Sequence, residues 1–253
     1  METENNFKIL GVRVDDLSRQ EITNQVCLFL SEQKFHQIAT LNPEFILKSE
    51  KNSQFKNILN DCDLNVIDGF GIKLAGFRYG RKLKARVTGI DLMLEILKIA
   101  NVKKLKIFLV ANSGGLSDWK ETRDAILKLY PKLNINGIDF DCHSCESRNP
   151  VSRLPVSILD SRFHGNDNNY DILFCNFGAP QQEIFINSIK SDTIRLAMGV
   201  GGGFDFLTGK IKRAPFFVRK LGLEWFWRLI QQPNRWKRIW NALIIFPIKV
   251  IFN

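Results

Sequence analysis

The sequence predicts an α/β fold in which helices flank a mostly parallel, Rossmann-like sheet and a basic helical appendage follows at the C-terminus. Short runs rich in β-branched and apolar residues alternate with helix-length amphipathic segments, and several runs end in a turn that contains glycine. This alternation of strand, turn and helix is typical of sheets whose strands run parallel. With 253 residues, 45% of them hydrophobic, the chain is long enough to bury a sizeable core.

The first half of the chain contributes two expected strands and two expected helices. Residues 35–40 form a strand-like run, and Pro43 follows in the position that proline prefers in the first turn of a helix. A helix is therefore expected at 43–51. A second strand is expected at 64–67, and apolar residues at helical spacing predict a helix at 89–100.

The second half repeats the pattern. A buried strand is expected at 105–110, and a turn rich in glycine then opens a helix that runs to about Tyr130. Two more apolar strands are expected at 170–175 and 194–200. In such sheets, ligands gather beyond the carboxyl ends of the strands. The residues expected there are Thr40, Asn42, Asp68, Gly178 and Gly201.

One segment, about 142–169, breaks the pattern. It is rich in Ser, Asn, Arg and Pro, and it stands where a crossover helix is expected, so we interpret it as an inserted surface loop. It contains Cys142 and Cys145 in a CxxC spacing, with His143 and His164 nearby. The sequence offers no second CxxC pair, which argues against a metal site. The five cysteines of the chain are odd in number and scattered, which favours reduced thiols.

The tail at 209–253 differs in character from the rest of the chain. It carries ten Lys and Arg residues against one acidic residue, while the whole chain has a net charge of +10. It also holds four of the five tryptophans. Trp and Arg together on an amphipathic helix are typical of an interfacial membrane anchor. We therefore expect a catalytic α/β domain at 1–208 and a membrane-associating appendage at 209–253.

The expected location is cytoplasmic, on the inner face of the cell membrane. The sequence contains no run of roughly 18–20 apolar residues, the length that a spanning helix needs. Its first residues are polar and acidic, unlike a secretory signal.

Three motifs suit a phosphate-containing substrate, and each also has a purely structural interpretation. The loop at 199–204 resembles a phosphate-cradling loop, or it is a tight turn between a strand and a helix. Asp68 follows a strand and precedes glycine, where a carboxylate serves as a general base or as a helix cap. A cluster of basic residues in this chain would either clamp a diphosphate or form a solvated face. The cluster comprises Arg78, Arg81, Lys82, Lys84 and Arg86.

Taken in order, these and further motifs resemble the WecG/TagA/CpsF family of bacterial glycosyltransferases. The resemblance spans nearly the whole chain and fails only at the insert. Its N-terminal half is carried by TLNPE at 40–44, DGFG at 68–71 and RVTGID at 86–91. Its C-terminal half is carried by FGAPQQE at 177–183 and the loop at 199–206, and its appendage by the basic run at 210–238.

The resemblance implies an inverting, metal-independent enzyme without a cofactor. It would transfer N-acetylmannosamine from UDP to undecaprenyl-diphosphate-linked N-acetylglucosamine in cell-surface polysaccharide biosynthesis. Asp68 would deprotonate the 4-hydroxyl of the acceptor, Arg86 would bind phosphate, and Gln182 would line the pocket. The residues expected to position the donor sugar or the acceptor are Thr40 and Asn42. Those expected to hold part of UDP are Gly201, Gly202 and Asp205, and those expected to close over the diphosphate are Arg228, Arg235 and Arg238.

Two alternatives stay open at this point. Motif matching does not resolve the donor, so UDP-N-acetylmannosaminuronic acid or UDP-glucose are alternative donors. From another class, the chain would be a non-catalytic protein that binds a membrane or nucleic acid through its basic tail. Aromatic stacking on bases would suit nucleic acid, but the tail carries no nucleic-acid-binding signature, so nucleic acid is not an expected partner. The resemblance also suggests a homo-oligomer.

Overall fold

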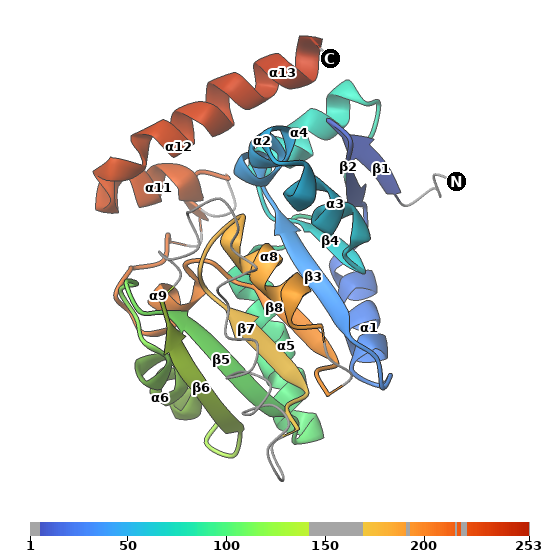
Figure 1. Ribbon diagram of the computed structural model, residues 1–253. Helices are drawn as coiled ribbons and strands as arrows, with labels where there is room; N and C mark the ends of the chain where they lie inside the picture. Colours follow the sequence, from blue (N-terminus) through green and yellow to red (C-terminus); the bar gives the residue numbers. More distant parts are fainter. Residues whose placement is uncertain (1–5, 142–168, 191–192, 216, 219–221, 253) are drawn as a thin grey trace.

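The structure is a computed structural model that describes residues 6–141, 169–190, 193–215, 217–218 and 222–252. Over these residues, a six-stranded sheet in the order β4-β3-β8-β7-β5-β6 forms the centre of the molecule (Figure 1). Every pair of neighbouring strands in it is parallel, which confirms the predicted fold class. The strands are β3 (His36–Leu41), β4 (Leu64–Ile67), β5 (Lys106–Asn112), β6 (Asn134–Phe140), β7 (Ile172–Cys175) and β8 (Leu196–Gly199).

Side chains of the central strands alternate between two apolar layers. On β5, Ile107 and Leu109 enter one layer, while Phe108 and Val110 enter the other. Burial on both faces explains why the strands read as continuous apolar runs in the sequence. The helices of the first layer are α1 (Arg19–Phe29), α5 (Gly89–Lys103), α6 (Trp119–Leu129) and α9 (Gly203–Leu207). Those opposite are α2 (Pro43–Lys51), α3 (Ser53–Asp61) and α8 (Gln181–Ser188).

A small antiparallel hairpin, β1 (Asn6–Ile9) and β2 (Val12–Asp15), adds a second sheet beside the first. It packs with α4 (Phe70–Arg78) into the same apolar cluster as α2 and α3. This hairpin was not predicted from the sequence.

The predicted strands are all present, with bounds within two residues of those expected, and the helix at 43–51 is found as predicted. The sequence analysis missed β6. It is an edge strand, and its exposed polar residues, among them Asn134 and Asp139, interrupt the apolar run that marks a buried strand. The expected insert at 142–169, with Cys142, His143, Cys145 and His164, lies outside the described residues except for Asn169.

The appendage, which we define as residues 209–253, contains several short helices that lie across one end of the molecule (Figure 1). Its last helix packs on α4 and α2. The helices are α11 (Glu224–Gln231), α12 (Trp236–Trp240) and α13 (Phe246–Phe252), with a 3-10 turn (Pro233–Arg235) and a π turn (Asn241–Ile245) between them. Within the described residues, we find no helix with the length and apolar character needed to cross a membrane.

Candidate active site

The candidate site lies where β3 and β4 end. The two strands are parallel and pair Leu41 with Ile67, so Asn42 and Asp68 follow at the same edge of the sheet. The backbone N–H of Asp68 donates to the Leu41 carbonyl at 2.9 Å and fixes the turn. A side chain on Gly69 would come within 2.6 Å of Pro43 Cδ, so glycine allows the turn to approach α2 closely.

Asp68 is partly accessible and sits among charges from two other parts of the chain, Arg86 and the helix α11. Burial is the main cause that raises its pKa to about 7, and the negative charge of Glu224 raises it further. The positive charges of Arg86 and Arg228 and a hydrogen bond from the Gly89 backbone lower it. A carboxyl group with a pKa near 7 is suited to accept a proton at neutral pH.

Arg228 reaches this site from α11. Its guanidinium lies 4.9 Å from the ring centre of Phe206 and against the glycine loop, where a side chain on Gly202 would come within 2.6 Å of its Nη2. Burial lowers the pKa of Arg228, and the charge of Asp68 opposes that shift. Among the described residues, its buried Nε and Nη2 find no hydrogen-bond acceptor. Two buried donor atoms that the described residues leave without a partner, on a half-buried cation, are suited to bind an anionic oxygen.

Arg235 and Arg238 extend the positive charge around Arg228. Burial, followed by the charges of Arg228 and Arg238, lowers the pKa of Arg235 to about 10. Arg238 forms an ion pair with Glu44 at the start of α2, with Nε 2.8 Å from Oε2. The pKa of Glu44 is lowered because the cations around it outweigh its burial. Because the three arginines repel one another, an anion bound among them would be stabilised by all three charges.

Thr40 and Asn42 lie beside these residues. Thr40 is buried at the end of β3, next to Gly89 at the start of α5. The Asn42 side-chain oxygen accepts from the backbone N–H groups of Glu44 and Phe45 at 2.9 and 3.2 Å, so it caps α2. Whatever else Asn42 does, it fixes the start of this helix.

Gln182 is buried and ties two glycine turns together. Its side-chain oxygen accepts from the backbone N–H groups of Gly178 and Gly201, at 3.0 and 3.1 Å. Both glycines have positive φ, +80° and +48°. The amide nitrogen of Gln182 donates to Glu183 Oε1 at 2.6 Å. The turn after β7 and the loop after β8 are thus held by one side chain.

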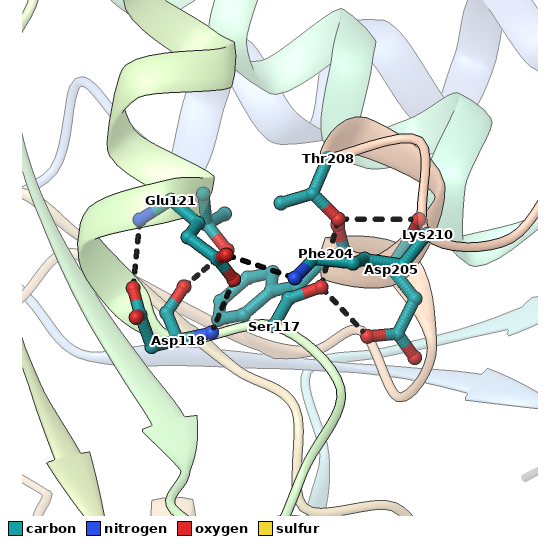
Figure 2. A network of polar contacts seen from close by, with 8 residues as sticks. Ser117, Asp118, Glu121, Phe204, Asp205, Thr208 and Lys210 are labelled. Atoms are coloured by element: carbon teal, nitrogen blue, oxygen red, sulfur yellow. Dashed lines mark hydrogen bonds and ion pairs between the residues drawn. The ribbon is translucent and has the colours of Figure 1, made fainter.

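Asp205 is fixed by a polar network that sequence reasoning did not find (Figure 2). Ser117, which is fully buried, donates to Asp205 Oδ1 at 2.9 Å, and its hydroxyl lies 2.7 Å from that of Thr208. Close by, Lys210 pairs with Glu121 at 2.8 Å. Burial raises the pKa of Asp205, although the Ser117 hydroxyl and nearby cations oppose the shift. This network joins the loop before α6 to α9.

The basic cluster found in the sequence does not act as a single unit. Arg86 faces Asp68. Lys84 instead pairs with Glu21 at 3.3 Å, and Arg81 lies over the ring of Phe7 at 5.3 Å. Arg213, from the basic run of the tail, joins the appendage to Asp91 of α5 at 2.6 Å, a contact that was not predicted.

At one edge of the parallel sheet, a carboxyl group of raised pKa and several arginines lie together, and these are the groups that a transferase for a phosphate-containing donor needs. The sequence places the chain in a family of that kind: residues 7–253 match the glycosyl transferase WecG/TagA/CpsF family, and the chain belongs to it. The protein is therefore a glycosyltransferase.

Three of its relatives carry the name N-acetylglucosaminyldiphosphoundecaprenol N-acetyl-beta-D-mannosaminyltransferase. A protein of that name from Staphylococcus aureus (strain MW2) is 30% identical over 254 residues, which covers 96% of this chain and 91% of the relative. The Bacillus subtilis protein is 31% identical over 203 residues, or 80% and 74% of the two chains. The Bacillus spizizenii protein is 29% identical over 212 residues, or 83% and 77%.

Proposed function

We propose that this enzyme transfers N-acetylmannosamine from UDP to undecaprenyl-diphosphate-linked N-acetylglucosamine, with inversion and without a metal ion. The observation that carries the proposal is Asp68, a carboxyl group with a raised pKa between Arg86 and Arg228 at the carboxyl end of β4. The names of the relatives support this acceptor and this sugar. UDP-N-acetylmannosaminuronic acid and UDP-glucose are the alternative donors.

In the proposed step, Asp68 takes the proton of the acceptor's 4-hydroxyl as that oxygen forms a bond to the anomeric carbon of the donor. The bond between the anomeric carbon and the UDP oxygen breaks on the opposite face. UDP leaves with the electron pair, and the configuration inverts. The step therefore requires a base, Asp68, on the side of the acceptor, and positive charge on the side of the donor, where UDP leaves.

Arginines supply that positive charge in this proposal. Arg228 has two buried donors without a partner among the described residues, and Arg235 lies within its field. A guanidinium group can donate two parallel hydrogen bonds to phosphate oxygens. These bonds stabilise the transition state most where negative charge develops as UDP departs. Gly201, Gly202 and Asp205 would hold the rest of the nucleotide, beside the loop that Gln182 fixes.

A peripheral position on the membrane completes the proposal. The appendage exposes Trp236 and Trp240 together with Lys237. Amphipathic aromatic residues beside cations suit a lipid interface, where the acceptor would lie. The rival proposal, a non-catalytic binding module, does not explain why charged groups surround Asp68.

The first experiment follows UDP release from UDP-N-acetylmannosamine with a short-chain, water-soluble acceptor and EDTA present. Asp68→Asn is compared with Asp61→Asn, a change at an exposed carboxylate. We expect release that needs the acceptor, persists in EDTA, and falls at least about 10²-fold in Asp68→Asn only. Because only the ionised carboxylate accepts a proton, kcat/KM is expected to rise about tenfold per pH unit below about pH 7 and then level off.

Three outcomes would count against parts of the proposal. Full activity of Asp68→Asn would show that Asp68 is not the base. Activity that is lost in EDTA and restored by magnesium would show that the reaction needs a metal ion. Release only with the uronic acid or glucose donor would replace N-acetylmannosamine.

A further inference from the structure

A buried serine, Ser117, is held in place by the backbone on either side of it. Before it, the backbone N–H of Gly115 donates to the Asn112 carbonyl at 2.8 Å and closes a turn after β5. After it, Asp118 caps α6 by accepting from the backbone N–H of Glu121 at 2.7 Å. The Glu121 carboxylate accepts in return from the backbone N–H of Asp118 at 3.3 Å. The position of Ser117 is therefore fixed by its own loop.

The Ser117 hydroxyl holds one oxygen of the Asp205 carboxylate (Figure 2). The side chain is fully buried, where a hydroxyl needs a hydrogen-bond partner, and it donates to Asp205 Oδ1 at 2.9 Å. The hydroxyl of Thr208 lies 2.7 Å from that of Ser117 and belongs to the same network. Hydrogen bonds to a charged acceptor are stronger than those between neutral groups. The Ser117 hydroxyl thus fixes which way the carboxylate points.

The other oxygen of Asp205, Oδ2, lies beside the glycine loop. A Cβ added at Gly202 would be 3.7 Å from Oδ2 and 2.6 Å from Nη2 of Arg228. A hydrogen-bond acceptor and a hydrogen-bond donor therefore meet at the same part of this loop. Burial raises the pKa of Asp205, and the hydrogen bond from Ser117 is the largest effect that opposes the shift. Ser117 therefore also favours the ionised carboxylate, in which both oxygens are acceptors.

A nucleoside diphosphate carries the two kinds of group that fit these partners. Its diphosphate oxygens suit a guanidinium group, and its ribose hydroxyls suit a carboxylate, as in other α/β folds that bind nucleotides. We propose that Ser117 is a positioning residue for the donor nucleotide, which holds Oδ1 of Asp205 so that Oδ2 accepts from a ribose hydroxyl. The inference rests on the proposed function, in which Asp205 holds part of UDP. Because its side chain is fully buried, Ser117 acts through Asp205 and not by touching the nucleotide.

The test measures nucleotide binding without catalysis. Calorimetry gives the Kd of the full-length protein for UDP and for dideoxy-UDP, which lacks both ribose hydroxyls. The ratio of these two Kd values reports what the hydroxyls contribute. Ser117→Ala and Ser117→Cys, whose thiol is a weak donor, are compared with Thr122→Val. Thr122 is the matched control, because it is fully buried on α6 and its hydroxyl donates to the Asp118 carbonyl at 2.7 Å.

We expect the wild type to bind dideoxy-UDP at least about tenfold more weakly than UDP, and Ser117→Ala to bind the two nearly alike. The ratio for Ser117→Cys lies between these limits, and Thr122→Val keeps the ratio of the wild type. In the assay of UDP release, KM for the donor rises about tenfold in Ser117→Ala. The kcat at saturating donor stays within about twofold, because the base and the arginines are unchanged.

An unchanged ratio in Ser117→Ala would overturn the inference even if UDP bound more weakly, because the loss would then be a general structural one. Equal binding of UDP and dideoxy-UDP by the wild type would also overturn it, as would the same fall of the ratio in Thr122→Val. If the ratio depends on Ser117 as expected but no donor is turned over, the proposed function fails and the role of Ser117 stands. If the wild type transfers the sugar and the ratio does not depend on Ser117, only the inference fails.

Discussion

The α/β body and the appendage are held together by different forces. In the body, both faces of the sheet are covered by buried aliphatic and aromatic side chains. Among the described residues of α11 to α13 and the turns between them, only Phe246 and Val250 are buried. Ion pairs supply many of the other links, including Arg238 with Glu44 and Lys249 with Glu50.

This difference decides how firmly each part of the molecule is held in place. Exposed ion pairs contribute at most about 1 kcal/mol each, so the appendage is docked far less firmly than the sheet is packed. Yet the appendage brings Arg228 and Arg235 to the site, while the body brings Asp68. In the proposed function, the loosely held part binds the leaving group and the rigid part holds the base.

The largest expected effect comes from removing the charge that the appendage contributes. Arg228→Met leaves a side chain that still covers Phe206 but offers no donors to the departing diphosphate. We expect kcat to fall on the order of 10³-fold, or about 4 kcal/mol of transition-state stabilisation. Lys237→Met, a change at an exposed cation of the same appendage, serves as the control. A fully active Arg228→Met would show that the appendage contributes no charge to the departing diphosphate.

The next effect tests whether one aromatic residue docks the appendage. Phe246→Ala leaves a cavity against α4 and is expected to cost about 3 kcal/mol. The loss should be local: hydrogen exchange in α11 to α13 increases, activity falls, and exchange in β3 and β8 stays slow. Phe252→Ala removes an aromatic residue that is 85% exposed in the same helix and should change none of these. Equal loss of protection in the sheet would show that body and appendage unfold as one unit.

The sequence was sufficient for the parts of this molecule that depend on local patterns. Apolar runs locate the central strands, and turns place Asp68 and Gly201 at strand ends, because each signal lies within a few residues. Contacts between distant segments leave no such signal. Ser117 meets Asp205 across 88 residues, and Arg213 meets Asp91 across 122. Only folding brings these pairs together, so neither contact could be found from the chain alone.

The smallest effect concerns a weakness inside the body itself. Glu183 is buried, and burial is the main cause that raises its pKa from 4.5 to about 8, while the hydrogen bond from Gln182 opposes the shift. The folded state holds this proton up to about pH 8, whereas the unfolded chain releases it near pH 4.5. The buried Glu183 carboxyl therefore lowers the stability of the fold least below pH 4.5, where it is protonated in both states. Its contribution to stability is lost as pH rises towards 8.

Glu183→Gln should remove this dependence, since a glutamine still offers an oxygen to Gln182 but cannot ionise. The free energy of unfolding of the wild type, measured with urea, is expected to fall relative to the variant by at most about 1.4 kcal/mol per pH unit between pH 5 and 8. For Asp124→Asn, at an exposed carboxyl group of α6, the free energy of unfolding should change with pH in the same way as for the wild type. If the free energy of unfolding of Glu183→Gln changes with pH as the wild type does, Glu183 is ionised in the folded body. The body would then contain a buried charge beside the turn that Gln182 holds. Like the appendage, it would depend on charged groups and not only on apolar packing.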